Sequence, residues 1–69
     1  MTAAEKEFIA EKTREHLVRW AEQQVCEGSP AIENPSPFRT FAIEKGWIST
    51  SGDRVLAAGF KVASAYLRR

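Results

Sequence analysis

His16 and Cys26 are the side chains of this sequence best suited to nucleophilic chemistry. A cysteine becomes a strong nucleophile when a histidine within hydrogen-bonding distance takes its proton. Both residues fall in one predicted helix, where a separation of ten residues corresponds to about 15 Å along the axis. The two side chains therefore cannot meet within one chain, and we predict no catalytic Cys–His pair.

The sequence also lacks the residues that metal and nucleotide sites need. A single histidine and a single cysteine are too few for a zinc site. The glycines are scattered, and none opens a helix with the Gly-Lys-Ser/Thr pattern of a phosphate-binding loop. We therefore expect a protein that is not an enzyme and that takes no cofactor, metal or small-molecule substrate.

A basic pattern is more informative, because Arg54, Lys61 and Arg68 are spaced seven residues apart. If the last helix starts early, this spacing places all three on one face, with small residues between them. Such a face can approach a phosphate backbone closely. The alternative is the ordinary solvated side of an amphipathic helix, whose opposite side is apolar.

The first of three predicted helices covers about residues 3–26. Thr2 and Glu5 form a capping box before it, Gly28 is suited to end it, and no glycine or proline interrupts it. On a helical wheel one stripe faces a core, and it contains Ala3, Ile9, Ala10, Thr13, Leu17, Trp20, Ala21 and Gln24.

This helix is too long for a compact body of the same chain. About 24 helical residues span about 36 Å, whereas a domain of this length has a radius of gyration of about 11 Å. The helix must therefore overhang the body or be covered by a partner. Phe8 lies off the stripe, and it is either an ordinary exposed residue or a contact with a second chain.

The second helix is expected at about 37–45, between an N-cap at Ser36 and Gly46, with Arg39 and Thr40 toward solvent. Residues 47–56 have two interpretations. They form a short β-hairpin around Ser51-Gly52, followed by a helix at about 57–68, or a helix starts near Asp53. The predicted core is Ile9, Leu17, Trp20, Ile32, Phe38, Phe41, Trp47, Ile48, Leu56, Phe60 and Leu67.

The net charge of +1 conceals an uneven distribution. Residues 1–35 hold seven acidic and four basic residues, and residues 36–69 hold two acidic and six basic residues. The two halves can attract each other within the fold or across a dimer. With one cysteine, no apolar signal-peptide core and no apolar run of membrane-spanning length, we expect a soluble cytoplasmic protein that does not enter a membrane.

Several motifs follow one another in the second half. A short helix precedes Gly46-Trp47-Ile48, then Ser51-Gly52 between apolar pairs, then Val55-Leu56-Ala57-Ala58-Gly59-Phe60 opening a helix. Over residues 37–69 this order resembles the back half of a winged-helix domain, although only one helix precedes it where a complete domain has two. The resemblance implies contact by the helix before the wing and by the wing tip, through Arg39, Thr40, Glu44, Ser51, Gly52 and Arg54.

The sequence therefore predicts one small, mainly α domain with three helices. Two functions follow from its surface patterns. The first is a non-catalytic protein-interaction or regulatory module that self-associates through the long first helix, with Phe8 as a contact. The second is a small winged-helix-like nucleic-acid binder that uses the basic half. The near-neutral charge favours the first.

Overall fold

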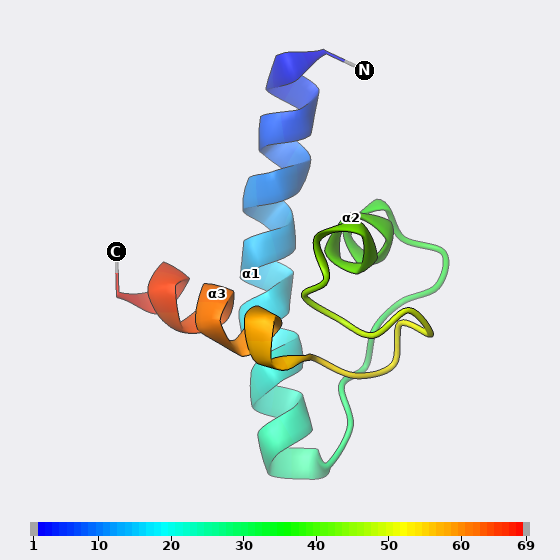
Figure 1. The fold of residues 1–69 in the computed structure, drawn as a ribbon, viewed down its shortest axis with the longest axis vertical. Helices are drawn as coiled ribbons and strands as arrows, with labels where there is room; N and C mark the ends of the chain where they lie inside the picture. The colour runs from blue at the N-terminus through cyan, green and yellow to red at the C-terminus, as the bar shows by residue number, and fades with distance from the viewer. Residues whose placement is uncertain (1, 69) are drawn as a thin grey trace.

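In a computed structural model of the chain, residues 2–68 are described; Arg69, one of the basic residues counted above, lies outside them. The chain folds into α1 (Ala3–Glu27), α2 (Pro37–Lys45) and α3 (Ala57–Leu67). Figure 1 shows α2 and α3 packed on α1, which is the axis of the molecule. The predicted mainly helical fold is confirmed, and each helix end lies within one residue of its predicted position.

The helix ends follow from the residues that flank them. The backbone N–H of Glu5 donates to the Thr2 hydroxyl at 3.2 Å, and Gly28 ends α1 in the left-handed conformation with φ of +89°. The Ser36 hydroxyl accepts from the first backbone N–H groups of α2. In contrast, α3 begins after Leu56 with no side-chain cap.

Residues 47–56 form a minimal hairpin. The pairing reduces to one antiparallel bridge between Ile48 and Val55. Two backbone hydrogen bonds of 2.9 Å flank it, from Ser49 N to Arg54 O and from Leu56 N to Trp47 O. The hairpin interpretation is therefore the correct one. The alternative helix from Asp53 is wrong, because these backbone groups are paired across the hairpin.

Gln24 of α1 takes the place of a third strand beside this hairpin. Its side-chain amide donates to the Val55 carbonyl at 3.0 Å, and the Val55 N–H donates to its side-chain oxygen at 2.5 Å. Both polar groups of the Val55 backbone are thus satisfied by one side chain. An isolated two-stranded hairpin is marginal in water, and this pair of bonds, together with the burial of Ile48 and Val55, holds the hairpin on α1.

Gly59 lets α3 lie directly on the hairpin. A Cβ built on it would overlap the Trp47 carbonyl and lie 2.8 Å from Cγ1 of Val55. Any larger residue would therefore force α3 away from the hairpin backbone. Gly59 is in the first turn of α3, where its cost to the helix is small.

The core lies where α1 meets the other two helices. Its buried apolar residues are Leu17, Trp20, Ala21, Ala42, Ile48, Val55 and Ala63. Thr13 is also buried, and its hydroxyl donates to the Ile9 carbonyl at 2.6 Å. Aromatic rings border this core: the His16 ring stacks on Phe38 at a centroid distance of 4.6 Å, and Phe41 meets Trp47 edge-on.

Two residues predicted in the core are exposed. Leu56 is 41% exposed, because it precedes α3 and takes no helical position. Leu67 is 65% exposed, because α3 crosses α1 and its last turn leaves the body (Figure 1). The other expected core residues are buried or half-buried: Ile9, Leu17, Trp20, Ile32, Phe38, Phe41, Trp47, Ile48 and Phe60.

The molecule is flat, and α1 overhangs it. Its extents are 36 × 28 × 15 Å, and the longest is close to the length of about 37 Å expected for the 25-residue helix α1. The first turns of α1 extend past α2 and α3 (Figure 1), and every residue from Thr2 to Phe8 is exposed. Of the two alternatives, an overhang or cover by a partner, the single chain shows the overhang. Ala3, expected on the buried stripe, is exposed because no other element lies beside it.

Gly59→Ala tests the close approach of α3. A glycine-to-alanine change in a helix normally stabilises by about 1 kcal/mol. Here the added methyl meets a backbone carbonyl, so we expect a net loss of about 1–3 kcal/mol in the free energy of unfolding. Denaturant unfolding measures this loss. Ala65→Gly, at an exposed position of α3, is the control and gives the effect of helix propensity without a change in packing. An unchanged or raised stability would contradict the packing described here.

Gln24→Ala tests the link between α1 and the hairpin. The variant leaves the Val55 N–H and carbonyl without partners, so we expect a loss of about 1–3 kcal/mol and faster hydrogen exchange at the Val55 amide. Gln23→Ala is the matched control, because the Gln23 side chain accepts one exposed bond, from Ala31 N. Equal losses in the two variants would show that the Val55 bonds contribute nothing specific.

Candidate protein-interaction surface

Residues suited to catalysis are dispersed or already engaged in packing. His16 stacks between Trp20 and Phe38, whereas Cys26 is exposed near the other end of α1. Among residues 2–68 no group of three histidine, cysteine or acidic side chains is placed to hold a metal ion. Nor does any helix of that range have the length and apolarity to cross a membrane.

Two of the predicted contact residues on α2 are bonded within the chain. Nη2 of Arg39 donates to the Ser51 carbonyl at 2.8 Å, and its guanidinium lies against Gly52. Arg39 was expected toward solvent and is instead half-buried between α2 and the hairpin. The Thr40 hydroxyl donates to the Ser36 carbonyl at 3.2 Å. Arg39 thus supports the hairpin tip in this structure.

The three basic residues at seven-residue spacing do not form one helix face. Arg54 precedes α3, so only Lys61 and Arg68 lie on the same side of this helix. All three side chains are exposed. Nε of Arg68 donates to the Ser64 carbonyl one turn earlier, at 3.4 Å. The early helix start that would have aligned all three is wrong.

Asp53, considered above only as the start of a helix, lies in the hairpin turn. Its carboxylate accepts from the hydroxyls of Ser51 at 2.6 Å and Ser49 at 2.9 Å. These bonds favour the ionised form and lower the pKa of Asp53 below its ordinary value. The carboxylate organises the hairpin turn. Because its pKa is lowered, it is a weak base and is unsuited to take up a proton near neutral pH.

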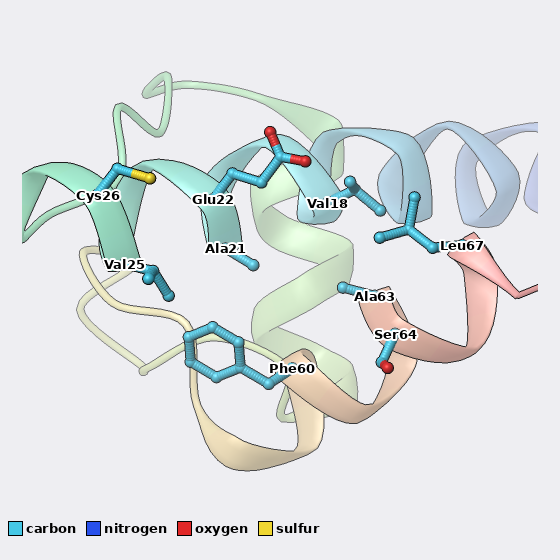
Figure 2. Close-up of a pocket in the computed structure, with 9 residues that line it drawn as sticks. All are labelled: Val18, Ala21, Glu22, Val25, Cys26, Phe60, Ala63, Ser64 and Leu67. Carbon is cyan, nitrogen blue, oxygen red and sulfur yellow. The ribbon is translucent and has the colours of Figure 1, made fainter.

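A groove between α1 and α3, here called the α1–α3 groove, is an open surface lined mainly by apolar and small residues. It is lined by Val18, Ala21, Glu22, Val25, Cys26, Phe60, Ala63, Ser64 and Leu67, with a volume of about 310 Å³. Figure 2 shows Ala21 and Ala63, both buried, between the two helices. Above this floor Val25 is 73% exposed and Leu67 is 65% exposed. Large apolar side chains thus flank a floor of small ones.

The two walls of the α1–α3 groove carry opposite charges. Glu22 belongs to the α1 wall. On the α3 side, Ser64 lines the groove. Lys61 lies three residues before Ser64 and Arg68 four residues after it, so both are its neighbours on the helix surface and flank the outer edge of the groove. Within residues 2–68 neither Glu22 nor Lys61 has an ion-pair partner.

The α1 wall continues along the helix as a surface stripe, here called the outer stripe. Its members alternate at four- and three-residue spacing, which keeps them on one side of a helix: Ala4, Phe8, Glu11, Glu15, Val18, Glu22 and Val25. Phe8 is 56% exposed on the overhang. The stripe was not recognised from the sequence, because its glutamates hide the heptad spacing of its apolar residues.

A second apolar groove lies on another side of α1, beside α2. It has a volume of about 510 Å³ and is lined by Lys6, Ile9, Pro37, Thr40, Phe41, Glu44 and Lys45. Lys45 lies over the Phe41 ring, 5.4 Å from its centroid. Unlike the α1–α3 groove, it has acidic and basic residues together on its α2 side, Glu44 and Lys45.

Comparison with family models, curated proteins and solved structures found no match for the chain.

Proposed function

We propose that this chain is a non-catalytic protein-interaction module that self-associates through α1. The observation that carries the proposal is the exposure of Phe8 and Val25, two large apolar side chains at opposite ends of the outer stripe. Exposed apolar residues that continue into a groove are typical of interaction surfaces. A regulatory role is compatible with such a module and belongs to the same proposal.

The size of the domain supports self-association. A chain of 69 residues buries a smaller fraction of its surface than a larger domain does. Here the flat shape limits the core further, since the shortest extent is 15 Å. Association of two copies is a common way for so small a domain to gain buried apolar area. The overhang of α1 supplies surface that the monomer cannot cover.

Phe8→Ser tests the role of α1. Phe8 is exposed, so we expect the free energy of unfolding of the monomer to change by less than about 0.5 kcal/mol. We expect the dimer to weaken by about tenfold, which corresponds to about 1.4 kcal/mol. Sedimentation equilibrium over a range of concentrations measures the dimer constant.

Leu56→Ser is the matched control, because Leu56 is a partly exposed apolar residue outside α1. It should leave the dimer constant unchanged. A wild-type chain that stays monomeric at every accessible concentration would contradict self-association. A dimer insensitive to Phe8→Ser would show that the overhang takes no part in it.

Nucleic-acid binding is the second candidate, and the observation in its favour is the exposed basic side of α3. Lys61 and Arg68 lie on that side, and Arg54 is exposed just before the helix. The winged-helix resemblance implies further contacts from α2 and the hairpin tip. It ranks lower because Arg39 and Thr40 are bonded within the chain.

Titration of labelled duplex DNA and RNA at several salt concentrations tests this candidate. We expect affinity to fall steeply with salt, and Arg54→Ala and Lys61→Ala each to reduce the salt slope by about 0.9 if each side chain contacts one phosphate. Lys6→Ala on the overhang is the control and should leave binding unchanged. An absence of binding at low salt would remove this candidate.

A further inference from the structure

The α1–α3 groove specifies the chemistry of its occupant. Val25, Phe60 and Leu67 require apolar side chains against them. Glu22 on the α1 wall would gain an ion pair from a basic group, and Lys61 with Arg68 beside the α3 wall would gain one from an acidic group. The occupant must therefore present an apolar strip with an acidic edge and a basic edge.

The chain itself presents such a surface, namely the same groove. Its α1 wall carries Glu22 (Figure 2), and the helical spacing places Lys61 and Arg68 beside its α3 wall. We propose that the α1–α3 groove docks the α1–α3 groove of a second copy, with α1 of each copy lying against α3 of the other. This proposal rests on the proposed function, because it names a surface through which self-association occurs. Phe8 lies outside this groove, so a dimer weakened by Glu22→Lys and unchanged by Phe8→Ser would place the contact in the groove alone.

The charges select this arrangement from the two that a two-fold axis allows. A two-fold axis parallel to the groove places the α1 wall of each copy against the α3 wall of the other. Glu22 then faces the partner's Lys61 and the partner's Arg68, and the symmetry repeats this contact on the other side of the interface. An axis across the groove would place α1 on α1 and bring glutamates of the two outer stripes together. Like charges facing each other are unfavourable. The groove-to-groove arrangement with exchanged walls is therefore favoured.

The local ion pairs on α1 do not compete with this interface. Glu15 pairs with Lys12 at 3.4 Å and Glu11 with Arg14 at 3.6 Å, both three residues apart on the surface. Such exposed ion pairs contribute little to the stability of the fold. Glu22, nearer the centre of the groove, has no ion-pair partner among residues 2–68, so docking would supply one without breaking an existing pair.

Charge reversal on each wall tests the proposal. Glu22→Lys alone places like charges opposite each other in both halves of the dimer, and so does the double variant Lys61→Glu with Arg68→Glu. We expect each to weaken self-association by tenfold or more. A mixture of the two variants restores opposite charges at both contacts, so we expect a heterodimer with wild-type affinity, measured by sedimentation or by fluorescence transfer between labelled copies.

Glu27→Lys and Arg54→Glu are the controls, because both residues are exposed and neither lines the groove. They should leave the dimer constant unchanged. The reversed positions are exposed in the monomer, so we expect each variant to fold, and circular dichroism checks this. Alkylation of Cys26, which lines the groove, gives a second readout: its rate should fall as the wild-type concentration rises through the dimer constant.

The outcomes separate this proposal from the proposed function. If the wild type dimerises but Glu22→Lys dimerises equally well or better, the exchanged-wall arrangement is wrong while self-association stands. Failure of the two reversed variants to associate with each other would also overturn it, as would an alkylation rate of Cys26 that does not depend on concentration. A strictly monomeric wild type overturns both.

Discussion

Gly59 places the backbone of α3 directly on the Trp47 carbonyl, and the alanines Ala21 and Ala63 let α3 lie close to α1. The rest of the structure depends on this close approach, because α3 is the element that closes the core over the hairpin. The same small residues have a second effect. Ala21 and Ala63 form the floor of the α1–α3 groove, and the larger side chains Val25 and Leu67 beside them stay exposed. Tight packing at the centre thus creates the apolar surface at the edge.

Gln24 stabilises the two short extended segments of the hairpin, which have no further strand beside them. Across the hairpin Ile48 and Val55 make one bridge, and the side-chain amide of Gln24 supplies both missing hydrogen bonds to the Val55 backbone. Arg39 acts similarly at the tip, where it donates to the Ser51 carbonyl. Gln24 and Arg39, both from helices, thus take the place of strand partners. Because the Arg39 guanidinium is bonded to the hairpin, it is not a free cation on the surface.

The sequence predicts what depends on neighbouring residues and misses what depends on distant ones. The capping residues and the stripe containing Leu17 were recognisable, because caps and helical periodicity act within a few residues. Gln24 was placed on the stripe, but its bonds to Val55 could not be foreseen. The exposure of Leu67 depends on the crossing of α3 over α1, which no local pattern encodes. The α1–α3 groove was missed for the same reason, since its walls come from opposite ends of the chain.

Gln24 and Val55 are 31 residues apart, and the contact between Gly59 and Trp47 lies further toward the end of the chain. During translation α1 is complete long before either contact can form. A chain that has emerged only as far as the hairpin therefore exposes the part of α1 on which α3 packs. A fragment that ends before Ala57 lacks α3 and, with it, Ala63 beside Ala21, so its core is incomplete and open to proteases.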